Sequence, residues 1–203
     1  GPDGSIYAGG NFTLAGGVAN TAYIAKWNGS AWQPLGTGMV GGPVWAIEFD
    51  AAGNLYAGGD FTSASGVANT ARVAKWNGSA WSALGTGVAG SSGVYAMAFD
   101  SYGVLYIGGN FTSVGGVGAN YVAKWNGSTW SALGSGAGGI VWTLVADNNG
   151  NVYVGGQFTT IGGVSATRIA KWNQLSFSAL GSGLNNIPRT MLITPDGMLY
   201  VGG

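Results

Sequence analysis

The sequence contains no cysteine and no histidine among its 203 residues. The absence of cysteine excludes disulfide bonds and thiol nucleophiles, and the absence of histidine excludes Ser-His-Asp triads. Together the two absences remove nearly every transition-metal site that is built on nitrogen or sulfur ligands. The sequence therefore predicts no metal site, no cofactor and no catalytic residue.

Charge is also scarce in this chain. Charged residues make up 7% of the sequence, and seven Lys and Arg balance seven Asp and Glu, scattered singly rather than in runs. Without a basic run, the sequence argues against nucleic acid or an anionic membrane surface as a partner. No apolar stretch approaches the roughly 18 residues that span a bilayer, so membrane insertion is not expected.

An internal repeat dominates what the sequence does contain. An element of the form hydrophobic-Tyr-x-Gly-Gly recurs about every 48 residues, at Tyr7, Tyr56, Tyr106, Tyr153 and Tyr200. A second element, AKWN, follows each of the first four and keeps the same spacing. Because the two elements keep a common period, we expect one repeat domain over 1–203. Its units are 1–50, 51–100, 101–147 and 148–194, with a partial extra strand at 195–203.

Each unit is predicted to form four antiparallel strands. Within one repeat period, Gly93–Asp100 and Val104–Thr112 are rich in strand formers and form one tight hairpin. A second hairpin follows through Asn126-Gly127, a dipeptide suited to a type I′ turn. Long connections, such as 62–70 and 86–93, then fall at one end of every sheet, where a binding site is expected. The predicted fold class is all-β, a β-propeller of four four-stranded blades of about 48 residues plus a duplicated partial blade.

The second part of each unit, as in LYAGGDFT and VAKWNGSAWSAL, resembles Kelch repeats. The Kelch positions in the second unit are occupied by Tyr56, Gly58, Gly59, Trp76 and Trp81. The fourth unit departs from this pattern, with Gln174 in place of the turn glycine and Phe177 in place of the second Trp. The first hairpin, as in VADNNGNVYVGG, is similar to NHL-type and other bacterial propeller repeats. Both resemblances imply a propeller, a fold that serves interaction platforms, lectins and enzymes.

The number of blades in the ring is open at this stage. The first unit begins inside its second strand, and residues 187–194 could supply the missing first strand. The segment Met198–Gly203 then duplicates a strand that Ser5–Gly10 already provides. We therefore expect either a segment of a larger propeller or a ring that closes between chains, as in a homodimer with eight blades.

Polar residues follow the glycines of the second strand in every unit, and Phe-Thr comes after them. The candidate ligand-binding residues are therefore Asn11, Asp60, Asn110 and Gln157, with Thr13, Thr62, Thr112 and Thr159. Their amides and hydroxyls on the face of the long connections would suit the hydroxyl groups of a glycan. The alternative is that they cap turns and satisfy backbone groups of the loops.

The repeated aromatic residues are predicted to be structural anchors that pack between blades, and sugar stacking is the alternative. They are Trp27, Trp76, Trp125, Trp172, Trp32, Trp81, Trp130, Tyr7, Tyr56, Tyr106 and Tyr153. A lysine precedes each AKWN tryptophan. We interpret these lysines as solvated edge residues or as cations over a neighbouring ring.

The sequence does not favour an enzyme. Glu48 is the only Glu, and no second carboxylate is evident beside it, which argues against a glycosidase centred on Glu48. The first hypothesis is a non-enzymatic binding module that presents repeated shallow sites to a glycan or protein ligand, extracellular or on the surface of a bacterium. The alternative is a structural or scaffold repeat protein, amplified or engineered, with no specific ligand.

Overall fold

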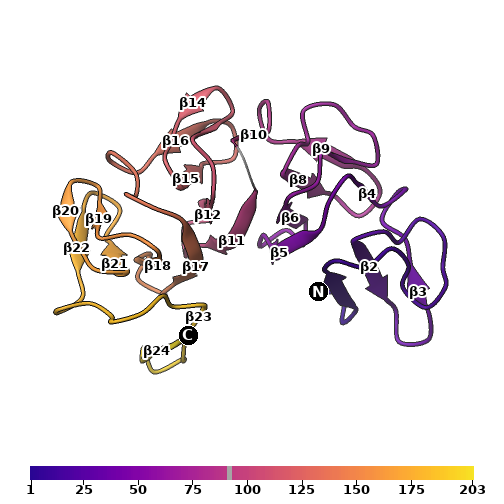
Figure 1. The fold of residues 1–203 in the computed structure, drawn as a ribbon. Coiled ribbons are helices and arrows are strands. Elements are labelled where there is room, and N and C mark those ends of the chain that lie inside the picture. Colours follow the sequence, from indigo (N-terminus) through magenta and orange to yellow (C-terminus); the bar gives the residue numbers. More distant parts are fainter. Residues whose placement is uncertain (91–92) are drawn as a thin grey trace.

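The computed structural model describes residues 1–90 and 93–203, and all of its regular elements are strands. The strands form antiparallel sheets that stand side by side as blades in an open arc (Figure 1). The blades follow one another around the arc in the order of the sequence. The expected all-β propeller architecture is confirmed. Within the described residues, no helix is long and apolar enough to cross a membrane.

Three blades have four strands, which run in chain order from the inside of the arc to its outside (Figure 1). The first of these contains β5 (Val44–Phe49), β6 (Leu55–Gly59), β8 (Val73–Trp76) and β9 (Trp81–Ala83). The second contains β11 (Val94–Phe99), β12 (Leu105–Gly109), β15 (Val122–Trp125) and β16 (Trp130–Ala132). The third contains β17 (Val141–Ala146), β18 (Val152–Gly156), β21 (Ile169–Trp172) and β22 (Phe177–Ala179).

The two ends of the arc carry partial sheets. The first has three strands, β1 (Ile6–Gly9), β2 (Ile24–Trp27) and β3 (Trp32–Gln33), and lacks the innermost strand. The last has two, β23 (Thr190–Ile193) and β24 (Leu199–Gly202). Among the described residues β23 pairs with β24 alone, so it does not add to the first sheet. The four-stranded pattern is thus complete in three units of this chain.

The long connections contain short strands that hold them together at one end of the blades. Their strands are β4 (Met39–Val40), β7 (Ser63–Ala64), β10 (Val88–Ala89), β13 (Ser113–Val114), β14 (Val117–Gly118), β19 (Thr160–Ile161) and β20 (Val164–Ser165). The connection that enters a blade pairs with the long connection inside that blade, as β4 pairs with β7. This end is the expected face of long connections. Of the predicted connection 86–93, positions 91 and 92 lie outside the described residues.

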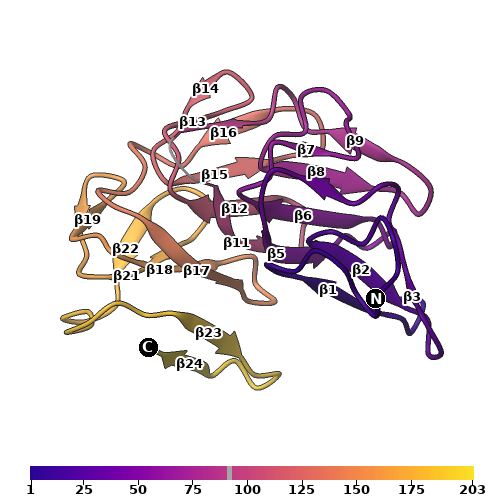
Figure 2. The same ribbon diagram turned by 45° about the vertical axis from the view of Figure 1, so that its right-hand side comes forward.

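The core of the protein lies between neighbouring blades, whose sheets stack face to face (Figure 2). The closeness of the stacking explains the glycines that end the second strand of each blade. A Cβ added to Gly58 would lie 2.6 Å from Cγ1 of Val94 in the next blade. At Gly108 the corresponding distance, to Cγ1 of Val141, is 2.3 Å. Larger residues at these positions would push the blades apart.

The second hairpin of each blade turns differently from the prediction. Gly127 has a φ of 99°, but Asn126 is not among the residues with positive φ. Asn126 N–H donates to the carbonyl of Thr129, so the turn residues are Gly127 and Ser128. Positive φ at the first turn residue is typical of type II′, so the predicted type I′ turn is wrong. The reason is the Asn126 side chain, whose Oδ1 accepts hydrogen bonds from the N–H groups of Ser128 and Thr129.

Candidate functional site

The inner strands β5, β11 and β17 each contain a β-bulge near their start. In β5 the pairing with β6 steps from Val44 to Ala46, so Trp45 is an extra residue in the ladder. The same shift leaves Tyr95 extra in β11 and Trp142 extra in β17. A bulge re-aims the side chain of its extra residue. Three aromatic side chains are thus directed from neighbouring blades at the end where the long connections lie.

Two of these side chains join with an arginine in a continuous stack. The rings of Tyr95 and Trp142 are stacked, with centroids 4.8 Å apart and planes inclined by 7°. Cζ of Arg189 lies 4.7 Å from the centroid of the Trp142 ring. Arg189 comes just before β23, at the position that corresponds to Trp142 in the preceding unit. Each contact contributes about 0.5 to 1.5 kcal/mol, so the stack holds Trp142 in place.

A pocket of about 380 Å³ lies beside this stack, lined by Trp45, Asp60, Tyr95 and Trp142. Its volume is at the lower end of the range for small-molecule sites, and its wall is mainly aromatic, as such sites usually are. The Trp45 side chain is 48% exposed. No ring contact between Trp45 and Tyr95 occurs in the described part of the chain, although their blades are neighbours. The pocket is therefore a gap in an otherwise continuous row of flat side chains.

Asp60 supplies the charged group of the pocket. Its Oδ2 accepts a hydrogen bond of 2.8 Å from the indole N–H of Trp45. Its Oδ1 is buried and has no hydrogen-bond partner among the described residues, and the same holds for the indole N–H of Trp142. The ion pairs in residues 1–90 and 93–203 are Lys26–Asp3 and Lys75–Asp50, so no lysine or arginine there neutralises Asp60. Incompletely satisfied buried groups are uncommon in folded proteins and often mark functional sites.

The structure separates the residues predicted to bind a ligand. Asp60 lines the aromatic pocket and the other seven do not. Asn110 is partly buried, whereas Asn11, Gln157 and the four threonines are exposed. The Thr62 hydroxyl donates to the carbonyl of Val40 and so serves the backbone of a loop. A ligand role for these seven residues stays a prediction.

Sequence reasoning missed Trp45, Tyr95, Trp142 and Arg189. A signal was present, because Trp45 and Trp142 are the two tryptophans outside the AKWN and second-hairpin positions. They also occupy the same position of their units as Tyr95 and Arg189. The bulge that turns these side chains toward one another has no marker in the sequence.

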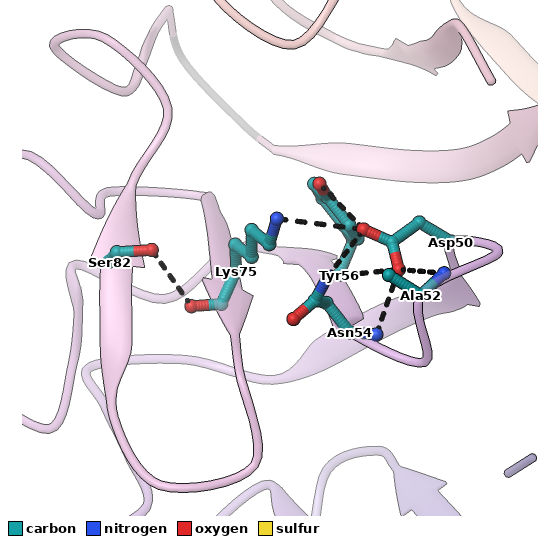
Figure 3. Close-up of polar contacts among 6 residues, drawn as sticks. All are labelled: Asp50, Ala52, Asn54, Tyr56, Lys75 and Ser82. Atoms are coloured by element: carbon teal, nitrogen blue, oxygen red, sulfur yellow. Dashed lines mark hydrogen bonds and ion pairs between the residues drawn. The ribbon is translucent and has the colours of Figure 1, made fainter.

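A second cluster of charged groups lies at the opposite, tight-turn end of the blades (Figure 3). Oδ1 of Asp50 accepts hydrogen bonds from the N–H groups of Ala52 and Asn54, at 3.0 and 2.8 Å. Its Oδ2 accepts from the Tyr56 hydroxyl at 3.3 Å and lies 3.5 Å from Nζ of Lys75. Burial raises the pKa of Asp50, but hydrogen bonds from Asn54 and the charge of Lys75 outweigh it and leave the pKa below its ordinary value. The cluster closes a turn and fastens it to the neighbouring strand.

The same turn chemistry recurs in the next two blades. Oδ1 of Asp100 accepts from the N–H groups of Tyr102 and Val104, and Oδ1 of Asp147 accepts from those of Asn149 and Asn151. The repeated lysines lie over aromatic rings, with Nζ 5.3 to 5.8 Å from the ring centroids. Among residues 1–90 and 93–203, no group of three or more Asp, Glu, His or Cys side chains is placed to hold a metal ion.

Comparisons with known proteins address the fold and the class of protein. Residues 148–174 match a family model described as a domain of unknown function, DUF5122, with a β-propeller fold. A search of curated proteins finds no match. Among solved structures, the chain is similar to a gluconolactonase from Xanthomonas campestris, with a TM-score of 0.56 and 12% identity. The match covers 91% of this chain and 63% of the gluconolactonase chain, so this chain spans less than two thirds of that protein. The chain is thus built from propeller repeats.

The comparison with the gluconolactonase contradicts two expectations. The sequence predicted a non-enzymatic binding module and argued against an enzyme, whereas a protein of similar fold is described as an enzyme. The prediction rested on residue types and on carboxylate pairs within the repeats. A propeller can also bring together residues of neighbouring blades, as in this pocket, where Trp45 and Asp60 of one blade meet Tyr95 and Trp142 of the next two.

Proposed function

We propose that the aromatic pocket is an active site for the hydrolysis of a small cyclic ester, with a sugar lactone as the substrate class. The observation that carries the proposal is the placement of Asp60, a carboxylate without a cationic partner in the described residues, in the wall of a pocket lined by three aromatic rings. The pocket has the size of a site for a compact molecule rather than for a polymer.

The aromatic rings and the carboxylate suit different parts of such a substrate. The C–H face of a sugar-derived ring is apolar and packs well on an indole. A carboxylate oxygen has two acceptor sites, and the Trp45 indole occupies one of those on Oδ2 of Asp60. The second acceptor site can orient a water molecule toward the ester carbon. The hydrogen bond from Trp45 fixes the carboxylate in this position.

The proposed reaction is general-base hydrolysis. Oδ2 of Asp60 takes a proton from water as the water oxygen bonds to the lactone carbonyl carbon. The bond between that carbon and the ring oxygen then breaks, and the ring oxygen receives the proton and becomes a hydroxyl group. The product is a hydroxy acid, and Asp60 returns to its carboxylate form.

One comparison supports this proposal. The similar fold of a gluconolactonase supports the lactone as the first substrate class to test, although the likeness itself concerns the fold.

The type of propeller repeat is a second part of the proposal. We infer Kelch-like second hairpins from the repeated Gly-Gly and Trp positions, and NHL-like first hairpins from patterns such as VADNNGNVYVGG. The DUF5122 match supports the propeller repeat in general.

The test is the release of acid from D-glucono-1,5-lactone in a pH-stat, after subtraction of the spontaneous rate. We expect the protein to accelerate hydrolysis and Asp60→Asn to lower kcat by about 10²-fold or more, since general bases contribute that much. Asp196→Asn, at an exposed carboxylate of the β23–β24 turn, is the matched control and should keep full activity. A wild-type rate equal to the spontaneous rate, or an unchanged rate in Asp60→Asn, would overturn the proposal.

A further inference from the structure

The row of flat side chains at the loop end of the inner strands is interrupted at one place. Arg189, Trp142 and Tyr95 follow one another at stacking distance across three blades. The next position in the row is Trp45, which also sits on a bulge. Between Tyr95 and Trp45 the described structure has the aromatic pocket in place of a ring contact.

We infer that the substrate ring binds between Trp45 and Tyr95 and completes this row. The inference rests on the proposed function and names the binding mode and the ring shape that the site selects. The planar ester group flattens a lactone ring, so such a ring can lie against two aromatic faces at once. A pyranose in its chair form is thicker and presents axial groups to one of the two faces. The site therefore prefers a flattened ring over a chair.

The side chains on both sides of the gap are held before a ligand arrives. Tyr95 is stacked on Trp142, which Arg189 covers in turn. Trp45 is exposed, but its indole N–H is bound to Asp60. Little side-chain freedom is then lost on binding, which favours affinity. The hydrogen bond also places the carboxylate at the edge of the Trp45 ring, close to the edge of a ring stacked on it.

Trp45 and Tyr95 are thus specificity-determining residues in this binding mode. Their rings would contact the substrate, whereas Asp60 carries the proton transfer. Removing the Tyr95 ring should raise KM more than it lowers kcat, because stacking holds the substrate ring in the ground state as well as in the transition state. Removing Trp45 also removes the hydrogen bond to Asp60 and should lower kcat as well.

The binding test uses D-gluconolactam, in which an amide replaces the ester and keeps the ring flat without being hydrolysed rapidly. The readout is the indole N–H region of a ¹H–¹⁵N NMR spectrum, in which the Trp45 signal is identified by its loss in Trp45→Phe. We expect saturable shifts of the Trp45 and Trp142 signals. Trp45→Ala should weaken binding at least tenfold, and Trp45→Phe should retain most of it. The control, Trp32→Phe in the first blade, should bind as the wild type does.

Two results would overturn the inference. One is lactam binding that Trp45→Ala leaves unchanged in a variant whose thermal unfolding matches the wild type. The other is equal affinity for the lactam and for methyl β-D-glucopyranoside, which has a chair-form ring. The inference and the proposed function fail separately. Lactam binding without lactone hydrolysis would reject the catalytic role of Asp60 alone, and hydrolysis with an unchanged KM in Tyr95→Ala would reject the binding mode alone.

Discussion

The indole N–H of Trp130 donates a hydrogen bond of 2.8 Å to the carbonyl oxygen of Leu84 in the preceding blade. Both residues are buried, with exposed fractions of 5% and 2%. Trp81 makes the equivalent bond of 3.0 Å to Leu35 one blade earlier. The second-hairpin Trp therefore joins consecutive blades by a polar contact as well as by packing.

Replacing Trp130 should separate these two contributions. Trp130→Phe keeps most of the ring but leaves the buried Leu84 carbonyl without this donor, which should lower the free energy of unfolding by about 1 to 3 kcal/mol. Trp130→Ala also opens a cavity and should cost about 3 to 5 kcal/mol. Urea unfolding measures both changes. Trp32→Phe, at the same position of the first blade, should change stability by less than about 0.5 kcal/mol. Equal losses at the two positions would contradict the inter-blade role.

The fourth unit offers the reverse experiment. Phe177 stands where Trp130 stands in the third unit, and each ring packs against the glycine of a long connection, Gly162 or Gly115. Phe177→Trp should place an indole N–H near the carbonyl of Leu133, the counterpart of Leu84. We expect a gain of about 1 kcal/mol in the free energy of unfolding, the usual net value of a hydrogen bond. A loss of more than 1 kcal/mol would mean instead that the larger ring overfills the site.

The sequence was sufficient to predict the fold because the repeat presents the same pattern several times. The spacing of Tyr56 and Tyr106, and of Trp76 and Trp125, reveals a unit, and strand formers with turn residues divide that unit into hairpins. Each strand is then assigned from more than one copy. Because the units repeat faithfully, the strands of a β-propeller can be predicted from the sequence alone.

The candidate site was not predictable because its geometry depends on departures from regular structure. A bulge of one residue moves Trp45 out of the ladder, and no residue type in the sequence requires that bulge. The predicted turn type at Asn126 was wrong for a related reason. The Asn126 side chain accepts hydrogen bonds from the backbone, and the turn residues are Gly127 and Ser128. Asp60 was named as one of four equivalent polar residues. Its difference from the others comes from Trp45 and Tyr95, which belong to other strands.

A strained turn in the fourth blade gives a further prediction. Gln174 has a φ of 78°, where the other blades have glycine, and its side-chain amide donates to the carbonyl of Gly150 at 3.2 Å. Gln174→Ala keeps the strain and loses the bond, so it should lower the free energy of unfolding by about 1 kcal/mol. Gln174→Gly loses the same bond but relieves the left-handed strain, and should be about 1 kcal/mol more stable than the Ala variant. Urea unfolding compares the two, with the exposed Leu175→Ala as the control. A Gly variant less stable than the Ala variant would contradict this account.

Glu48 lies half-buried on β5, and burial raises the pKa of its carboxyl group above the ordinary value. The folded protein therefore binds this proton more tightly than the unfolded chain does. Below the ordinary pKa the group is neutral in both states, so Glu48→Gln should have nearly the wild-type stability there. As the pH rises through the raised pKa of the folded state, the wild type must bury a charge that the Gln variant lacks. The stability advantage of Glu48→Gln should therefore grow from pH 4 to pH 7.

Urea unfolding of both proteins at several pH values measures this advantage directly. Comparing the two proteins at each pH cancels the titration of the six aspartates that they share. A difference that is constant between pH 4 and pH 7 would show that burial does not oppose the charged form of Glu48. A difference that shrinks as the pH rises would mean that a neighbouring group stabilises the carboxylate.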